Sequence, residues 1–192
     1  MNSEELLTRY ASGERNFRDT DLFRAELSNA NLSGTNLFRA NLFRANLFRA
    51  NLLGVSLFNA NLIGANLYCA NLSGANLSGA NLTRADLTGA DLSGADLHGA
   101  DLSGAILSGA NLSYADLSKS TLFKAELLNA TLIHANLKGA NVKQTNLTGA
   151  VVQDAVFVKA MGLAFEVVSQ LKEQGAILEE ASSNRRVNAA MC

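Results

Sequence analysis

Few residues of this chain have the chemistry for acid–base or nucleophilic catalysis. Its only histidines, His98 and His134, occupy different places of a repeating pattern, and neither has a nucleophile pattern nearby. The two cysteines, Cys69 and Cys192, have neither the spacing of a metal site nor the number that a disulfide framework needs. We therefore expect two ordinary free thiols, no metal, no cofactor and no enzymatic activity.

Carboxylates form a denser group. Four of them, Asp86, Asp91, Asp96 and Asp101, follow one another at intervals of five residues. A catalytic pair would interrupt a repeat, whereas these four occupy a place that Asn or Asp fills along most of the chain. We interpret them as a solvated acidic belt, and a part in a recognition surface is the alternative.

A third group combines aromatic and basic side chains. Residues 37–52 read LFRANLFRANLFRANL, in which five letters recur without change. Neighbouring Phe and Arg side chains are typical of binding hot spots. They are equally compatible with a structural ladder, in which the rings stack and the Arg stems cover them. The choice depends on the element that positions these side chains.

That element repeats every five residues. From Leu22 to Phe157, 28 consecutive places hold 25 Leu, two Val and one Phe, and the residue two before is Ala in 23 of them. Asn or Asp usually precedes the Leu and two variable residues follow it, so the unit is A-(N/D)-L-x-x. A helix would rotate successive Leu by about 140°, and a straight strand would turn every second Leu to water. The chain must therefore turn a corner in each repeat, with Ala and Leu inside.

Glycine and proline support this interpretation. Twelve of the 15 glycines occupy the second variable place, where a corner needs a permissive backbone. Proline is absent, although about ten would be expected at its usual frequency. Coils stacked about 4.8 Å apart pair their backbone N–H and C=O groups, and proline has no N–H to offer. The sequence thus predicts an all-β solenoid.

The repeats over residues 20–160 resemble the pentapeptide repeat family, and the uninterrupted array is similar to those of its cyanobacterial members. The resemblance implies a right-handed quadrilateral β-helix with four repeats per coil, hence about seven coils for 28 repeats. Residues twenty apart would then lie above one another. The four aspartates of the acidic belt would form one complete ring.

Helical patterns flank the array. The N-terminal stretch SEELLTRYASGE has Ser3 as a candidate N-cap. The stretch MGLAFEVVSQLKEQG places Phe165, Val168 and Leu171 at helical spacing before Gly175. Because open β edges invite pairing with other chains, we predict short α-helical caps at both ends. A homodimer contact through the C-terminal helix is the alternative.

The predicted organisation therefore has four parts. Residues 1–15 form the N-terminal capping helix, 16–160 the β-helix, and 161–180 the C-terminal helix. The last stretch, residues 181–192, is predicted to be a flexible tail because chain termini are often poorly ordered.

Residues twenty apart in the sequence would form columns along the solenoid. One of these columns is the candidate protein-binding surface. It comprises Phe23, Arg24, Phe43, Arg44, Ile63 and Arg84. This column would suit an acidic or aromatic partner surface, and the structural ladder remains the other interpretation. Further along, Ser and Thr fill nine of the ten first variable places from 73 to 118, with His98 in the tenth, which makes a smooth waist.

The leading functional hypothesis is a non-enzymatic protein-binding scaffold with a regulatory or signalling role and an unidentified partner. A net charge of −1, no apolar leader and no apolar run of membrane-spanning length predict a cytoplasmic protein without membrane attachment. The resemblance supplies an alternative, since some family members bind DNA gyrase and topoisomerase IV by imitating duplex DNA. The balanced charge and the uninterrupted array depart from that pattern. Direct binding of single-stranded nucleic acid by the Phe and Arg columns is a third interpretation, and the acids Asp21 and Glu26 beside the column and the balanced charge argue against it.

Overall fold

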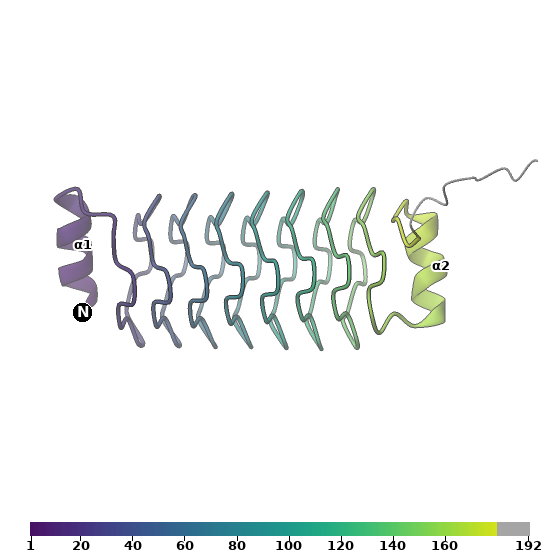
Figure 1. The fold of residues 1–192 in the computed structure, drawn as a ribbon, viewed down its shortest axis with the longest axis horizontal. Helices are drawn as coiled ribbons and strands as arrows, with labels where there is room; N and C mark the ends of the chain where they lie inside the picture. The colour runs from purple at the N-terminus through teal and green to yellow at the C-terminus, as the bar shows by residue number, and fades with distance from the viewer. Residues whose placement is uncertain (180–192) are drawn as a thin grey trace, which may run out of the picture.

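A computed structural model describes residues 1–179 as a straight rod with a helix across each end (Figure 1). Helix α1 spans Ser3–Ala11 and helix α2 spans Phe165–Glu173. Between them, parallel bridges join residues twenty apart, beginning with Asn16↔Asn36. One turn of the rod therefore takes four five-residue repeats. The tail predicted for residues 181–192 lies outside the described residues.

Each repeat consists of a three-residue side and a two-residue corner. In the repeat Ala40–Arg44, the first three residues form the side and the last two form the corner. The N–H of Ala45 donates to the C=O of Leu42 at 2.9 Å and closes the turn. The second corner residue, Arg44, has φ of +53°, and a positive φ at this place alone is the arrangement of a type II turn. The same place has a positive φ in every repeat from 19 to 159, with Gly in 12 of 29 cases.

Every backbone N–H of such a repeat has a hydrogen-bond acceptor. Asn41 donates to the preceding coil at 2.9 Å, and Leu42 and Arg44 donate to the following coil at 2.7 and 2.9 Å. Phe43 donates to the side-chain Oδ1 of Asn41 at 3.3 Å, and the Ala of the next repeat closes the turn. Since a proline at any place would remove one of these bonds, the absence of proline has a direct cause.

The sides form isolated bridges and not continuous strands. In residues 1–179 the assigned regular elements are the two helices, and the coils are joined through single bridge positions. The reason is geometric, because a corner interrupts the extended backbone after three residues. This resolves the conflict between the predicted β solenoid and the poor strand propensity of Ala, Asn and Asp.

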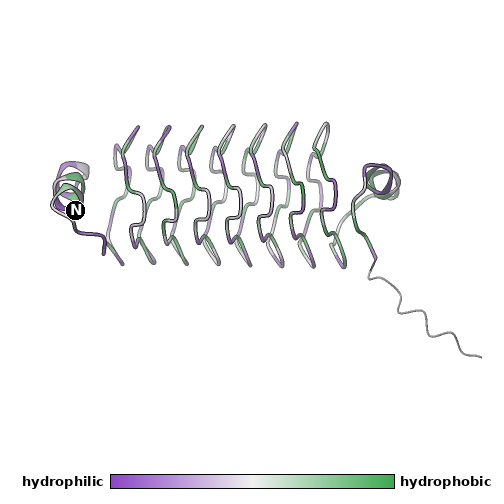
Figure 2. Ribbon diagram, turned by 90° about the horizontal axis from the view of Figure 1, so that it is seen from above, coloured by the Kyte–Doolittle hydropathy of each residue, from purple (hydrophilic) through white to green (hydrophobic). Residues whose placement is uncertain are grey.

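The core is a column of Leu and Ala inside the rod. At the central Leu place of each repeat, the side chains from Leu32 to Leu122 at steps of five have relative exposures of 0%. Hydrophobic and hydrophilic residues alternate around the turns of the rod (Figure 2). Burial of each Leu contributes about 1.5–3 kcal/mol to the free energy of unfolding. Phe17 and Phe157 occupy the Leu place in the first and last repeats. Leu6 of α1 and Leu171 of α2 belong to the same buried cluster.

Helix α1 begins with a different cap from the one predicted. The prediction of Ser3 as N-cap is wrong, because Asn2 occupies the N-cap and its side chain accepts the N–H of Glu5 at 2.8 Å. Ser3 is the first helical residue. Asn and Ser are comparable N-cap residues, so composition alone does not decide between adjacent candidates.

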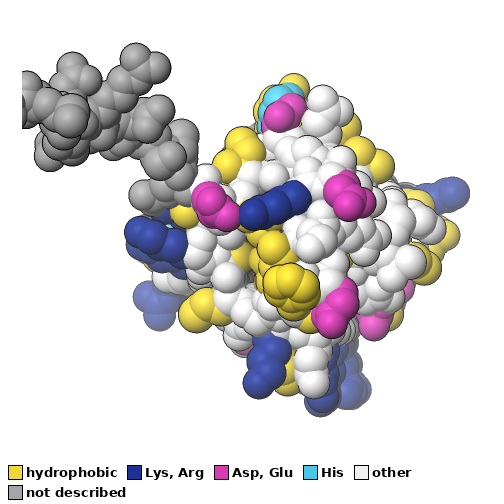
Figure 3. Space-filling model, turned by 90° about the vertical axis from the view of Figure 1, so that its right-hand side faces the viewer, with side chains coloured by type: hydrophobic (Ala, Val, Ile, Leu, Met, Phe, Trp, Pro, Cys, Tyr) yellow, Lys and Arg dark blue, Asp and Glu magenta, His cyan; other side chains and the backbone are white. Residues whose placement is uncertain are grey.

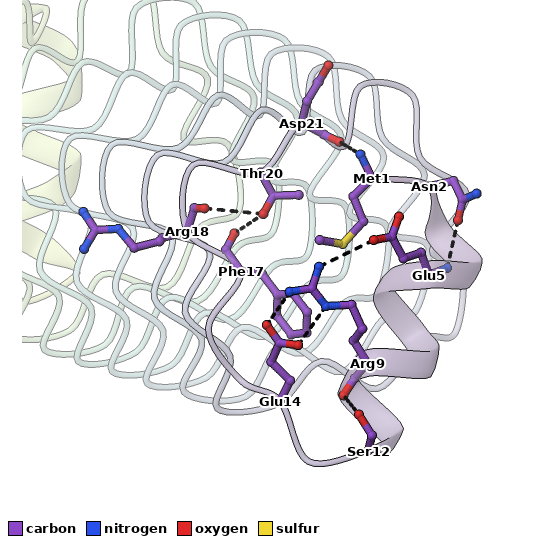
Figure 4. A network of polar contacts seen from close by, with 10 residues as sticks. All are labelled: Met1, Asn2, Glu5, Arg9, Ser12, Glu14, Phe17, Arg18, Thr20 and Asp21. Atoms are coloured by element: carbon purple, nitrogen blue, oxygen red, sulfur yellow. Dashed lines mark hydrogen bonds and ion pairs between the residues drawn. The ribbon is translucent and has the colours of Figure 1, made fainter.

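An ion pair joins α1 to the chain that enters the first coil. Arg9 donates to both carboxylate oxygens of Glu14 at 2.7 and 2.6 Å and lies 3.5 Å from Glu5 (Figure 4). The hydrogen bonds from Arg9 lower the pKa of Glu14 below its ordinary value. The guanidinium carbon of Arg9 also lies 5.6 Å from the ring centroid of Phe17. This contact fixes α1 over the first coil.

After helix α2 the chain returns to pair with the last turn of the β-helix. Gly175 comes directly after the C-cap residue and has φ of +86°, in agreement with its predicted place at the helix end. Two residues later, Ile177 forms a bridge with Val156, and its C=O accepts the N–H of Phe157 at 2.7 Å. The β ladder therefore extends past the repeats, and the sequence pattern gives no sign of this.

Gly74 and Gly79 provide a matched test of the corner geometry. Both have positive φ, but a Cβ at Gly74 would meet no atom within 4 Å, whereas a Cβ at Gly79 would overlap Asn59 Oδ1. We expect Gly74→Ala to lower the free energy of unfolding by about 1–2 kcal/mol through backbone strain alone, and Gly79→Ala to lower it further. Urea unfolding measures both. Equal losses for the two variants, or no rescue of Gly79→Ala by Asn59→Gly, would contradict this account.

The Arg9–Glu14 pair predicts a pH dependence. The folded-state pKa of Glu14 is lowered, so the pair stabilises the fold above the ordinary Glu pKa of 4.5 and loses its effect as the pH falls through the folded-state pKa. We expect Glu14→Gln to lower the urea midpoint at neutral pH, and the two midpoints to converge as the pH falls through the lowered folded-state pKa of Glu14. Glu173→Gln is the control, because no ion pair in residues 1–179 involves Glu173. A difference between the urea midpoints of wild type and Glu14→Gln that stays constant with pH would contradict a stabilising role for the Arg9–Glu14 pair.

Candidate protein-binding surface

The corners carry the side chains that differ from repeat to repeat. Because residues twenty apart are stacked, the corners form four columns along the rod. We name each column after its first pair of residues: 18–19, 23–24, 28–29 and 33–34. The six residues of the predicted surface all lie in the 23–24 column.

Phe and Arg form a stacked ladder at the start of the 23–24 column. The rings of Phe23 and Phe43 are 5.6 Å apart between centroids and inclined by 4°. The guanidinium carbon of Arg24 lies 5.1 Å from the Phe23 centroid, and that of Arg44 lies 5.3 Å from the Phe43 centroid. Each contact of this kind contributes about 0.5–1 kcal/mol at an exposed site. Phe23 nevertheless remains 51% exposed, so the ladder still offers apolar surface to solvent.

The column continues past the ladder in a regular way. Ile63 is half-buried and follows Phe43 in the stack. The stem of Arg44 crosses the corner of the next coil, where a Cβ on Gly64 would lie 3.4 Å from Arg44 Cγ. Arg84 crosses Gly104 in the same manner, at 3.6 Å from a Cβ there. The small residue in the next coil thus leaves room for the Arg stem.

Two further columns carry aromatic pairs that the sequence analysis did not separate. Phe38 and Phe58 stack at 5.6 Å in the 18–19 column, and Phe48 and Tyr68 stack at 5.7 Å in the 28–29 column. The repeated LFRA stretch therefore spreads over three corners of one coil. These pairs could have been found in the sequence, because Phe38 and Phe58, and likewise Phe48 and Tyr68, are twenty residues apart at the first variable place of their repeats.

The four belt aspartates act as turn formers. In each, Oδ1 accepts the backbone N–H of the residue two places on, at 2.9–3.0 Å, and all four side chains are half-buried. Asn41 does the same for Phe43, so Asp and Asn are equivalent in this role. The ring comprises Asp86, Asp91, Asp96 and Asp101.

Asp and Asn differ in their contacts between coils. The side-chain amide of Asn61 donates to Asn41 Oδ1 in the preceding coil at 3.1 Å, and similar bonds recur along the sides. An aspartate has no N–H to donate, so Asp96 cannot bond to Asn76 in this way. Asp96 also forms a bridge pair with Asp116, which places two carboxylates on adjacent coils.

The histidines and the cysteine lie apart from this surface. His98 Nδ1 is 2.9 Å from Ser118 Oγ, and His134 stacks on Tyr114 at 4.9 Å and lies 3.9 Å from a carboxylate oxygen of Asp154. Cys69 is a free, exposed thiol, and Cys192 lies outside the described residues. Within residues 1–179, no three His, Cys, Asp or Glu side chains are grouped so as to hold a metal ion.

The three apolar residues of the C-terminal helix have separate environments. Leu171 is buried against the core, Val168 is half-buried, and Phe165 is 83% exposed. Figure 3 looks at the end of the rod where α2 lies and shows apolar side chains grouped there between charged ones. Leu171 therefore packs into the interior of the chain, whereas the Phe165 side chain is exposed to solvent.

The five-residue unit identifies the family. A sequence profile for pentapeptide repeats matches in eight copies, over residues 16–39, 40–79, 70–109, 85–122, 110–149 and 125–160. Since these matches cover most of the chain, it belongs to the pentapeptide repeat family, whose members form right-handed β-helices.

Similar solved structures are members of the same family. HetL from Nostoc sp. strain PCC 7120, which is involved in heterocyst differentiation regulation, is 33% identical over 93% of both chains, with a TM-score of 0.44. A protein from the thylakoid lumen of Arabidopsis thaliana is 29% identical over 68% of this chain and 83% of its own, with a TM-score of 0.42. QnrB1, a plasmid-mediated fluoroquinolone resistance protein, is 16% identical over 83% and 96%, with a TM-score of 0.43. No curated protein matches the sequence.

Neither helix of the described chain could cross a bilayer, because both are too short and too polar for a membrane span.

Asp96→Asn tests the difference between Asp and Asn in the sides. The new amide can donate to Asn76 and no longer places a carboxylate beside Asp116. We expect the free energy of unfolding at neutral pH to rise by about 0.5–1.5 kcal/mol, the usual net contribution of one hydrogen bond. Ser118→Ala is a nearby control that leaves both carboxylates in place. An unchanged or lower urea midpoint for Asp96→Asn would show that the stacked carboxylates carry no cost.

Proposed function

We propose that this chain is a non-enzymatic scaffold that binds a protein partner through the 23–24 column. The observation that carries the proposal is the ordered Phe and Arg ladder of that column. Its rings are held by stacking on each other and by Arg side chains, yet Phe23 remains half-exposed. Aromatic and Arg side chains in fixed positions are the composition of interface hot spots.

The ladder and the binding surface are compatible interpretations of the same residues. A corner held by hydrogen bonds to two neighbouring coils gives its side chains little freedom to lose on binding. The stacked arrangement of Phe23 and Phe43 lowers this cost further, because the rings are already ordered in the free protein. A rigid solenoid thus presents its partner with groups at fixed intervals along the rod.

We further propose that α1 and α2 cap a solenoid of about seven coils. Leu6 and Leu171 are buried in the core cluster, which supports a role in closing the two ends. This corresponds to the proposed division into a helix within residues 1–15, a β-helix over 16–160 and a helix within 161–180. The sides of the rod are then the surfaces available for partners. A homodimer contact at the α2 end would involve Phe165, which is exposed.

The binding proposal predicts the loss of a partner in a column variant. The test protein replaces Phe23 and Phe43 by Ser and Arg24 and Arg44 by Gly, the residues found in the waist. Glycine suits the positive φ of both Arg positions, so we expect the fold to persist. Proteins retained from the native lysate are identified, and the retained partner is then purified and titrated against both forms. We expect at least about tenfold weaker binding by the column variant.

A matched control replaces Phe48 by Ser and Arg49 by Gly in the 28–29 column, where the same kind of stack occurs. This control should bind the purified partner as the wild type does. Equal binding by wild type and column variant would assign the ladder a structural role only.

The second candidate is binding of DNA gyrase or topoisomerase IV by imitation of DNA. The observation in its favour is the acidic ring of four aspartates at the waist, with Asp116 in the next coil. A purified supercoiling assay separates the candidates, since the scaffold proposed here leaves gyrase active. If the protein inhibits supercoiling, and the inhibition disappears when the ring aspartates are replaced by Asn, then imitation of DNA is the function and the scaffold proposal is wrong.

A further inference from the structure

Charge is sorted around the rod, although the net charge is only −1. One side of each coil, residues 20–22 and their equivalents at steps of twenty, lies between the 18–19 and 23–24 columns. We call this side with its two columns the cationic face. Within residues 16–160 it holds ten Lys and Arg and three Asp, a net charge of +7. The remaining surface of the array holds one Arg and seven Asp and Glu, a net charge of −6.

The twenty-residue winding produces this separation. Seen from the α2 end, Lys and Arg side chains project mainly from the left and lower edges of the molecule (Figure 3). The cation outside the cationic face is Arg49, and the three acids within it are Asp19, Asp21 and Asp101. A sequence average cannot show such a pattern, because neighbouring residues in the chain face different directions.

The 23–24 column is the most uniform part of this face. Its charged residues are Arg24, Arg44, Arg84, Lys124 and Lys143, all exposed and none acidic. No ion pair in the described part of the chain involves any of the five. Because successive coils lie about 4.8 Å apart, these five cations span about 29 Å along the rod. The column therefore continues well beyond the Phe and Arg ladder at its start.

Apolar side chains accompany the cations over this length. Phe23 and Phe43 lie at one end, and Phe123 lies near the other with Lys124 Nζ 5.2 Å from its centroid. A nucleic acid would need open ring faces for base stacking, but Phe23 and Phe43 already stack on each other and have Arg24 and Arg44 against them, which leaves less ring face for a base. Mixed apolar and cationic groups instead complement a protein surface that is acidic and partly apolar.

A second copy of the chain does not fit this column in a closed dimer. A twofold contact would place the same cations against each other, which is repulsive. Contact between the cationic face of one copy and the acidic surface of another would be heterologous and would continue into open-ended stacks. The occupant is therefore a different molecule.

On the basis of the proposed protein-binding function, we infer that the partner binds along the whole 23–24 column through an acidic segment that also carries apolar side chains. Arg24 and Arg44 with the Phe ladder hold one end of the segment. Arg84, Lys124 and Lys143 hold the rest. This assigns a binding role to three residues outside the Phe and Arg ladder.

The first test identifies the chemistry of the ligand. A displayed library of random twelve-residue peptides is selected on the immobilised wild-type protein. We expect the recovered peptides to be enriched in Asp and Glu together with aromatic or aliphatic residues. Recovery of peptides without acidic enrichment, or of none above background, would overturn the inference.

The second test locates the contact. A recovered peptide is labelled and titrated by fluorescence anisotropy against a triple variant with Arg84→Gly, Lys124→Gly and Lys143→Ser, which leaves the Phe and Arg ladder intact. Binding should weaken about tenfold or more and depend on salt, while Arg49→Gly on another column should change it by less than about twofold. Unchanged affinity of the triple variant would overturn the extension of the site.

Two outcomes separate this inference from the proposed function. Peptides that are not acidic but depend on Phe23 and Phe43 would retain the protein-binding function and overturn the acidic segment. A labelled twenty-base-pair DNA duplex that binds more tightly than every peptide, and loses binding in the triple variant, would reassign the cationic face to nucleic acid and overturn both.

Discussion

Hydrogen bonds between successive coils hold this rod together, and the other features depend on them. In a repeat such as Ala40–Arg44, three of the five N–H groups donate to a neighbouring coil, one closes the corner, and one is taken by the Asn side chain. An insertion within a side would shift the donors that follow it in that coil against their acceptors in the neighbouring coils. The period of five and the turn of twenty are therefore held constant along the rod.

The same bonds explain why the corner is left-handed in every repeat. The second corner residue must donate its N–H to the next coil while the chain turns, and it does so with a positive φ even when it is Arg, Lys, Tyr or His. Such a conformation costs a non-glycine residue about 1–2 kcal/mol. The stacking of many coils supplies more than this, and the seventeen non-glycine corners are where the chain displays distinctive side chains.

Rigidity and surface chemistry are connected through this geometry. Side chains twenty residues apart form columns, so a pair such as Phe23 and Phe43 stacks directly, and the Leu and Ala of the core need not differ from those of other repeats. The columns also sort charge, giving a cationic face and an acidic remainder from a nearly neutral chain. Leu6 of α1 and Leu171 of α2 belong to the same buried cluster as the Leu and Ala of the repeats.

The sequence by itself determined the family, the inward Ala and Leu, and the need for a corner in each repeat, because a period of five fits neither a helix nor a straight strand. It also located the glycine-rich corner place and the end of α2 at Gly175. It could not choose Asn2 over Ser3 as the N-cap, since both residue types suit that place. Only the tertiary structure showed that Ile177 returns to pair with Val156, that Leu171 turns inward while Phe165 faces out, and that each of the four columns carries an aromatic stack. These features depend on which residues of different coils meet, and local sequence carries no record of contacts made across a twenty-residue turn.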